Sequence, residues 1–177
     1  MRKIVFLEGL PGVGKTTLIK KIKERNLTNV YTVDEIIMES LKNVISNDEN
    51  DYMKNDEMKI NKYNKGLIII DRGPISTLSY NQANSIIDGN FDATPVKLWF
   101  ENIKQIFEEN TKIVYLTNYG YDYYLPYNKE NDAFGTIENQ KLLESISLYN
   151  CKKYSNNVVV KKYHKKDVEA IIDEIIN

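Results

Sequence analysis

The stretch that decides the fold is Gly9-Leu10-Pro11-Gly12-Val13-Gly14-Lys15-Thr16. It matches the pattern G-x-x-x-x-G-K-[ST], in which a glycine-rich loop leads from a strand into a helix. Glycines let backbone N–H groups approach phosphate oxygens closely, and the positive end of the helix points at the same phosphates. The lysine of the pattern reaches the β- and γ-phosphates, and the hydroxyl after it is a ligand of Mg²⁺. The stretch therefore predicts a binding site for ATP and Mg²⁺.

We expect the nucleotide to be held by this loop and by the first turn of the helix that follows it. The residues concerned are Gly9, Gly12, Val13, Gly14, Lys15, Thr16 and Thr17. Because backbone N–H groups make most of the contacts, the side chains of Leu10 and Val13 are expected to pack rather than to touch ligand. The alternative is a glycine-rich turn that binds nothing. It is disfavoured by the strand pattern before the loop and the helical pattern after it.

Short apolar runs alternate with segments of helical spacing along the whole chain. Strands are expected at residues 3–7, 30–33, 66–71, 113–116 and 158–160. Helices are expected at residues 15–25, from Asp34 onward, after Pro74, from Thr94 onward, at about 139–154 and around 168–175. This alternation predicts an α/β fold in which helices cover both faces of a parallel sheet, within one domain that spans residues 1–177.

Three of these segments carry more detailed expectations. Asp34 is a good N-cap for a helix with Ile37, Leu41 and Val44 on one face. Thr94 is expected to cap a helix whose first residue is Pro95. Residues 46–65 are highly polar, and they fit either a solvated helix or a mobile segment.

A second acidic group is expected beside the glycine-rich loop. An apolar run at residues 67–70 ends in Asp71, and ligands of open parallel sheets bind beyond the carboxyl ends of the strands. Asp71 is therefore a candidate to share the Mg²⁺ with Thr16, and it is also a candidate helix cap. Arg72 follows directly, and its planar guanidinium suits phosphate oxygens. We assign Arg72 to the acceptor or to the phosphoryl group in transfer, with a surface salt bridge as the alternative.

The composition of the chain argues against several other classes of protein. The formal net charge is -1, which gives no reason to expect binding to nucleic acid or to a membrane surface. The single cysteine, Cys151, cannot form a disulfide framework or a cysteine-rich zinc site. No apolar run approaches the roughly 20 residues that span a bilayer, and the N-terminus lacks a signal-peptide pattern. We therefore expect a cytoplasmic protein, with His164 as an ordinary surface residue.

Two blocks of the sequence resemble the thymidylate kinase and deoxynucleoside kinase group of P-loop kinases. The first block is residues 9–17, and the second is residues 71–82, which is similar to the thymidylate kinase pattern D-R-x-x-x-S-x-x-A-Y-Q. Asp71, Arg72, Ser76 and Tyr80 stand in register with this pattern, whereas Ser79 replaces the alanine and Gln82 is displaced by one position. The resemblance implies a three-layer α/β/α P-loop NTPase fold with a five-stranded parallel sheet and a lid at about residues 118–136. It also implies a kinase that moves the γ-phosphoryl group of ATP to a small molecule.

The same resemblance implies roles for individual residues. Asp71 and Arg72 would act at the acceptor and at the transferred phosphate, and Ser76, Tyr80 and Gln82 would contact the acceptor. Deoxynucleoside kinases carry an acidic residue just after the second strand as base for the acceptor hydroxyl, and Asp34 and Glu35 occupy that place here. Asp34 could equally be a plain helix cap, so the sequence leaves open whether Asp34 or Glu35 is the base. Homodimers are common in the group.

The chain departs from the group in its cations. The expected lid contains no arginine, and its only cation is Lys129, which we assign to the bound nucleotide. Thymidylate kinases also carry an arginine before the third strand, where residues 52–63 offer only lysines. A monophosphate acceptor brings about two further negative charges, so the shortage of arginine favours a neutral acceptor such as a nucleoside or another small alcohol. Charge for a monophosphate acceptor could still come from Lys54, Lys59, Lys62 and Lys129.

Three other classes of protein remain as alternatives. One is a motor or remodelling ATPase, which usually needs a larger chain and partners that supply arginine. A GTPase needs a guanine-reading N-K-x-D motif after a strand, and Asn128-Lys129-Glu130-Asn131 has asparagine in the acidic position. A non-catalytic nucleotide-binding protein would share the glycine-rich loop but would turn over no acceptor. The sequence therefore predicts a phosphotransferase for a nucleoside or a nucleoside monophosphate-like molecule.

Overall fold

The computed structural model describes residues 1–42, 48–108, 110–117, 133–162 and 167–176. Its centre is a sheet of five parallel strands in the order β2-β3-β1-β4-β5. The strands are β1 (Arg2–Gly9), β2 (Val30–Val33), β3 (Gly66–Asp71), β4 (Thr111–Thr117) and β5 (Val158–Lys162). The five strands expected from the apolar runs are all confirmed, and so is their parallel pairing.

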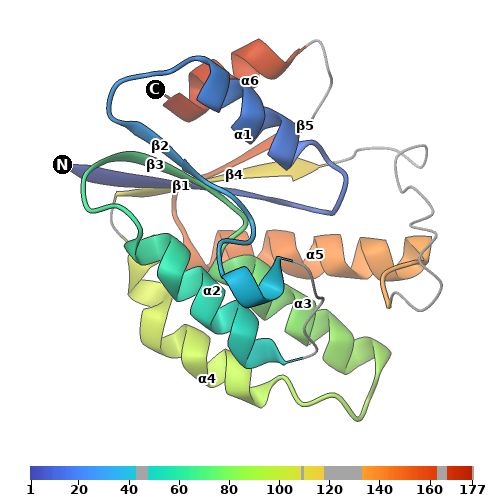
Figure 1. The fold of residues 1–177 in the computed structure, drawn as a ribbon. Helices are drawn as coiled ribbons and strands as arrows, with labels where there is room; N and C mark the ends of the chain where they lie inside the picture. Colours follow the sequence, from blue (N-terminus) through green and yellow to red (C-terminus); the bar gives the residue numbers. More distant parts are fainter. Residues whose placement is uncertain (43–47, 109, 118–132, 163–166, 177) are drawn as a thin grey trace.

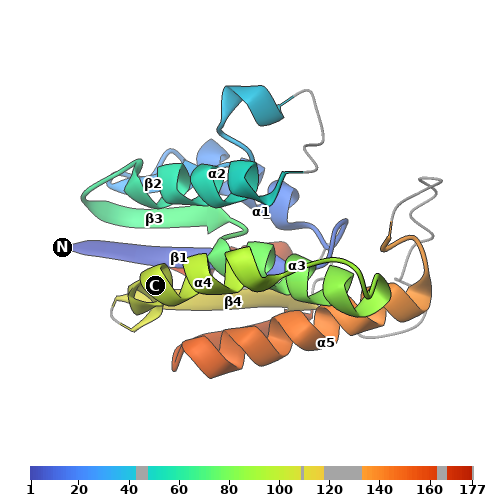
Figure 2. The same ribbon diagram turned by 90° about the horizontal axis from the view of Figure 1, so that it is seen from below.

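Helices cover both faces of the sheet (Figure 1). One face carries α1 (Lys15–Glu24) and α6 (Val168–Ile176), and the other carries α2 (Glu49–Asn61), α3 (Pro74–Ile87), α4 (Thr94–Ile103) and α5 (Ile137–Tyr154). Figure 2 looks onto the second face, where these four helices lie in front of the strands. Two 3-10 turns, η1 (Glu39–Leu41) and η2 (Lys104–Phe107), complete the described elements. The expected three-layer α/β/α arrangement is confirmed.

Strand β1 shows how the helices on each face are packed against the sheet. Successive side chains of a strand point to opposite faces of the sheet. Val5 and Leu7 are buried in one core with residues of α1 and α6, whereas Ile4 and Phe6 are buried in the other with residues of α3 and α4. A strand that is buried on both faces reads as a continuous apolar run, which is why β1, β3 and β4 were recognisable in the sequence.

The carboxyl ends of the three central strands lie at one edge of the sheet. Leu7 of β1 is in register with Asp71 of β3, and Gly9 of β1 is in register with Leu116 of β4. A Cβ atom on Gly9 would lie 2.2 Å from the carbonyl oxygen of Leu116, so only glycine allows the two strands to approach here. The sheet therefore brings the start of the glycine-rich loop next to the acidic end of β3.

The prediction of a helix from Asp34 onward is wrong. Residues 34–38 are irregular, the 3-10 turn η1 follows them, and Val44 lies outside the described residues. The reason is a competing partner for the backbone. The side-chain oxygen of Asn55 accepts hydrogen bonds from the N–H groups of Ile37 at 2.9 Å and Met38 at 3.1 Å. These bonds take the place of helical ones, and Ile37 still packs against the core.

The polar residues 46–65 contain helix α2, so the helical alternative is confirmed for this segment. Its N-cap is Asp48, whose side chain accepts from the N–H of Asn50 at 2.9 Å. The helix is not simply solvated, because three of its polar residues are almost completely buried: Asn55, Asp56 and Lys59. A polar face of a helix has thus been buried rather than exposed.

The remaining helices follow the sequence closely. Helix α4 begins at Thr94 rather than at Pro95, with Ala93 as its N-cap, so the expected threonine cap is one residue off. Asp92 takes up the first N–H instead, accepting from Thr94 at 2.8 Å. Helix α5 has 18 residues and carries charged side chains along its length. Within the described ranges, no helix combines the length and the apolar character needed to cross a bilayer.

Candidate active site

The glycine-rich loop joins β1 to α1 at the edge where the central strands end. Its glycines all have positive φ, with 133° at Gly9, 76° at Gly12 and 102° at Gly14. Gly14 is the N-cap of α1 in the left-handed conformation, so the helix begins abruptly and its free N–H groups face the loop. Val13 is buried in the α1–α6 core, whereas Gly12, Thr16 and Thr17 are exposed. This is the arrangement expected of an anion-binding loop.

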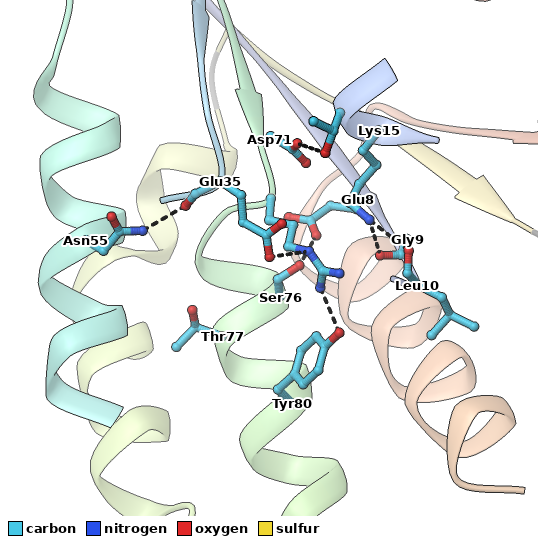
Figure 3. Close-up of polar contacts among 12 residues, drawn as sticks. Glu8, Gly9, Leu10, Lys15, Glu35, Asn55, Asp71, Ser76, Thr77 and Tyr80 are labelled. Carbon is cyan, nitrogen blue, oxygen red and sulfur yellow. Dashed lines mark hydrogen bonds and ion pairs between the residues drawn. The ribbon is translucent and has the colours of Figure 1, made fainter. Parts of the chain in front are cut away.

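Lys15 places its ammonium group inside the loop (Figure 3). The side chain is 4 % exposed, and Nζ donates to the carbonyl oxygens of Gly9 at 2.9 Å and Leu10 at 2.8 Å. Burial, together with the nearby Arg72 guanidinium, lowers the pKa of Lys15 to about 7. The negative charge of a phosphate would favour the charged form and so reverse this shift. Lys15 is therefore held where an anion would be stabilised most strongly.

Thr16, in the first turn of α1, and Asp71, at the end of β3, are hydrogen-bonded to each other. The Thr16 hydroxyl donates to Asp71 Oδ2 at 3.1 Å, and Asp71 Oδ1 has no hydrogen-bond partner among the described residues. Burial raises the pKa of Asp71, an effect to which the charge of Glu35 adds and which Lys15 partly offsets. A hydroxyl and a carboxylate oxygen are the ligands that Mg²⁺ accepts beside nucleotide phosphates.

These two residues fit a Mg²⁺ ion that is bound mainly through the nucleotide. Mg²⁺ prefers one or two carboxylates plus substrate phosphates and water over a cage made of protein alone. The described part of the chain holds no group of three or more His, Cys, Asp or Glu side chains that could form such a cage. The unpaired Asp71 oxygen is the observation that supports a ligand at this point.

Arg72 follows Asp71 in a strained conformation. Its φ is +56°, a region that costs a residue with a side chain on the order of 1–3 kcal/mol. The guanidinium is almost fully buried, with Nε 2.9 Å from Glu35 Oε1 and Nη1 donating to the Tyr80 hydroxyl at 2.9 Å. The Tyr80 ring also lies below the guanidinium, at 5.2 Å. The strained backbone therefore turns Arg72 toward Glu35. Arg72 does form a salt bridge, as the alternative had it, but its guanidinium is buried rather than at the surface.

The two acidic residues after β2 point to different places. Asp34 is exposed and pairs with Lys23 of α1, 2.7 Å away. Glu35 reaches across to Arg72 instead, and its side chain is 45 % exposed, so one oxygen can face a ligand. Figure 3 shows Glu8 between the side chains of Glu35 and Lys15, with Asp71 above them. The geometry therefore separates Glu35 from Asp34, which the sequence left as equals.

Of the other residues predicted to contact the acceptor, Tyr80 lies beside Arg72, whereas Ser76 and Gln82 are bonded to Glu8 and to α5. Tyr80 contacts Arg72 and sets its ring edge-on against Phe134, with ring centres 5.1 Å apart. Ser76 is buried and donates its hydroxyl hydrogen to Glu8. Gln82 lies against α5, where its side-chain oxygen accepts from Asn150 at 2.8 Å. Lys129 and most of the expected lid lie outside the described residues.

Glu8 is a member of the site that the sequence patterns did not single out. It is the last residue before Gly9, and it is completely buried in the structure. One carboxylate oxygen accepts from Ser76, and the other has no hydrogen-bond partner among the described residues. Burial raises the pKa of Glu8 to about 7, against the opposing effects of Ser76, Arg72 and Lys59. The available signal was an acidic residue at the end of an apolar strand, directly before the loop.

Replacing Glu8 with glutamine is expected to remove a pH dependence from the stability. A carboxyl whose pKa is about 7 when folded and 4.5 when unfolded favours folding below pH 4.5, and this contribution disappears as the pH rises through 7. The gap corresponds to about 3 kcal/mol. The Tm of Glu8→Gln minus that of the wild type should therefore increase between pH 5 and pH 8 in thermal unfolding experiments. A difference that stays constant over this range would show that Glu8 does not titrate there.

The fold of the chain is similar to that of several kinases. Deoxyadenosine kinase from M. mycoides, solved with bound dATP, has a TM-score of 0.69 at 15% sequence identity, and the match covers 99% of this chain and 100% of that one. Thymidylate kinase from Ehrlichia chaffeensis has a TM-score of 0.65 at 16% identity, with 98% and 96% covered. Thymidylate kinase from Candida albicans has a TM-score of 0.64 at 12% identity, with 98% and 88% covered.

No family model and no curated protein matches the sequence. The likeness to the solved kinases extends over almost the whole chain, and it confirms the P-loop kinase fold that the two sequence blocks predicted.

Proposed function

We propose that the chain is an ATP-dependent kinase that transfers the γ-phosphoryl group to a hydroxyl of a nucleoside. The observation that carries the proposal is the ion pair between Glu35 Oε1 and Arg72 Nε, 2.9 Å apart. The pair lies at the carboxyl edge of the sheet, where Lys15, Glu35 and Arg72 all act electrostatically on Asp71. A carboxylate suited to take a proton and a guanidinium suited to a phosphoryl group are thereby held next to the phosphate loop.

The donor end of the reaction uses the loop and the end of β3. The N–H groups of the loop and the start of α1 bind the phosphates, and Lys15 supplies a positive charge at the β- and γ-phosphates. Thr16 and Asp71 would hold Mg²⁺, which when bound neutralises charge on the phosphates. The structures of similar fold include a deoxyadenosine kinase with bound dATP, which supports a nucleotide as the ligand of this chain.

The acceptor end uses Glu35 and Arg72. The Glu35 carboxylate takes the proton of the acceptor hydroxyl as its oxygen forms a bond to the γ-phosphorus. The bond from that phosphorus to the bridging oxygen of the β-phosphate breaks, and ADP leaves. Arg72 keeps Glu35 oriented through Nε and presents the rest of its guanidinium, which Tyr80 steadies, to the group in transfer.

The charges around the acceptor favour a neutral molecule over a monophosphate. Arg25 is engaged with Asp173 and Glu169 on the far face, and the Arg2 guanidinium donates to the carbonyl of Ile60. Arg72 is thus the one arginine of the sequence at the site, and Glu35 already balances it. A monophosphate would add about two negative charges there.

The lysines of α2 that could have supplied further charge are limited as well. Lys59 is 2 % exposed and is paired with Asp56, 2.7 Å away, so it does not face the acceptor. Lys54 is exposed on the outer side of the helix, and Lys62 lies over the Tyr63 ring. The described residues therefore offer a monophosphate no second cation comparable to Arg72, and we favour a nucleoside.

A panel of acceptors tests the proposal. The protein is incubated with ATP, Mg²⁺ and, in separate reactions, nucleosides, nucleoside monophosphates and other small alcohols, and ADP formation is measured. We expect ADP formation to rise with one or more nucleosides above the rate without acceptor. Stimulation by monophosphates alone would overturn the neutral-acceptor proposal. Nucleotide binding without stimulation by any acceptor would favour a non-catalytic nucleotide-binding protein.

A further inference from the structure

Helix α2 buries three polar residues that no sequence motif explains. Asn55, Asp56 and Lys59 are each 2 % exposed, and they stand one and four positions apart, which places them on one face of the helix. Buried charges and amides are costly unless they are fully bonded, so a helix that buries three of them needs a compensating set of partners. We call these three residues the α2 polar layer.

The partners of the α2 polar layer are the strand ends that carry the proposed catalytic residues. Asn55 Nδ2 donates to the carbonyl oxygen of Glu35 at 2.9 Å, and Lys59 Nζ donates to the same oxygen at 3.2 Å. Lys59 Nζ also donates to the carbonyl oxygen of Asp71 at 3.3 Å. One ammonium group thus joins the end of β2 to the end of β3.

The layer also fixes the chain on either side of these points. Asn55 Oδ1 accepts from the N–H groups of Ile37 and Met38, so one side chain binds the backbone on both sides of residue 36. Asp56 pairs with Lys59 at 2.7 Å and accepts from the Thr77 hydroxyl of α3, also at 2.7 Å. The layer therefore connects β2, β3 and α3 around the Glu35–Arg72 pair.

We propose that Asn55, Asp56 and Lys59 are positioning residues that hold the Glu35 backbone and the Asp71 strand end so that Glu35 meets Arg72 and the acceptor hydroxyl. The inference rests on the proposed function for its catalytic consequence. Residues 34–38 form no helix or strand of their own, so their conformation is set by what they bind. Arg72 in turn needs its strained φ of +56° to reach Glu35, and the fixed Asp71 carbonyl lies directly before it.

The test compares two asparagines of the same helix. Asn55→Ala removes the bonds to residues 35, 37 and 38, whereas Asn61→Ala removes an exposed amide that donates to the carbonyl of Glu57 in its own helix. Under conditions where both variants are folded, we expect Asn55→Ala to lower kcat about 10²-fold without changing the KM for ATP, because a misplaced base slows transfer and leaves the phosphate loop intact. Asn61→Ala should retain the wild-type kcat.

Amide hydrogen exchange gives a reading that does not depend on activity. The N–H groups of Ile37 and Met38 should exchange faster in Asn55→Ala than in Asn61→Ala, because Asn55 is their acceptor. If Asn55→Ala does not fold, Asn55→Asp replaces it in the kcat measurement, with the same loss expected, since it keeps an acceptor for Ile37 and Met38 but has no N–H to give to Glu35.

Three results would overturn the inference. The first is a kcat of Asn55→Ala equal to that of Asn61→Ala. The second is a loss of kcat in Asn55→Ala that is fully explained by a smaller folded fraction. The third is a rise in the KM for ATP as large as the fall in kcat. A wild-type protein that transfers phosphoryl to no acceptor would instead remove the proposed function, and with it the catalytic consequence of the layer. The two failures are distinguishable, because the first occurs in an active wild type and the second does not.

Discussion

Replacing Lys15 with alanine is expected to lower kcat/KM for phosphoryl transfer by at least about 10²–10³-fold, the usual cost of losing one group that stabilises transition-state charge. The Lys15 ammonium is buried within the loop, and among the described residues no other cation lies where it could take its place. Arg72 and Lys59, the other buried cations nearby, are already engaged: Arg72 forms an ion pair with Glu35 and donates to the Tyr80 hydroxyl, and Lys59 is paired with Asp56. The measurement is steady-state ADP formation with the nucleoside that gives the highest wild-type rate.

Lys20→Ala is the matched control for this prediction. Lys20 belongs to the same helix α1 but is exposed, so its removal should leave the rate close to that of the wild type. Thermal unfolding of both variants shows whether the fold is kept. If Lys15→Ala kept most of the wild-type rate while folded, the glycine-rich loop would not be the donor site, and the assignment of the reaction would fail.

Replacing Glu35 with glutamine is expected to lower kcat by about 10²–10⁴-fold, the range contributed by a general base, with little change in the KM for ATP. Glutamine has the size of glutamate, so its side-chain oxygen can lie beside Arg72 Nε as Glu35 Oε1 does, 2.9 Å away, but the amide cannot take a proton from a hydroxyl. The loss should therefore fall on the chemical step and not on nucleotide binding. Kinetics at saturating ATP and nucleoside measure it.

The neighbouring acid provides the discriminating comparison. Asp34→Asn should keep most of the wild-type kcat, because Asp34 is exposed and its carboxylate faces Lys23 of α1, not Arg72. The opposite pattern, with Asp34→Asn inactive and Glu35→Gln active, would assign the base to Asp34 and contradict the geometry described above.

The parts of the fold that depend on apolar side chains could be predicted from the sequence. The runs at residues 67–70 and 113–116 are buried on both faces of the sheet, and such strands are recognisable because every position is apolar. The conformation of the glycine-rich loop could be predicted because its glycines are needed for backbone geometry, as the close approach of Gly9 to the Leu116 carbonyl shows.

The parts that depend on polar contacts between distant residues could not be predicted in this way. A helix was expected from Asp34 because Ile37 and Leu41 have helical spacing, but Asn55, about 20 residues away, binds the backbone N–H groups that such a helix would use. The same holds for α2, whose polar sequence fitted either a solvated helix or a mobile segment, because the sequence does not show that Glu35, Asp71 and Thr77 are the partners of its buried residues.

The candidate site shows the same division. Lys15, Thr16 and Asp71 were predictable because motif spacing and strand ends place them together. The choice between Asp34 and Glu35 required the position of Arg72, which depends on its positive φ. Glu8 carried only a weak signal, since one acidic residue at the end of an apolar strand does not reveal that it will be completely buried against Ser76.

The most direct test of the central claim is the fate of the γ-phosphoryl group. The wild-type protein is incubated with Mg²⁺ and ATP labelled at the γ-phosphate, together with the nucleoside that stimulates ADP formation most, and the labelled products are separated. We expect the label to appear in a nucleoside monophosphate in amounts equal to the ADP formed. Label found only in inorganic phosphate, or transferred only when the acceptor is already a monophosphate, would contradict it.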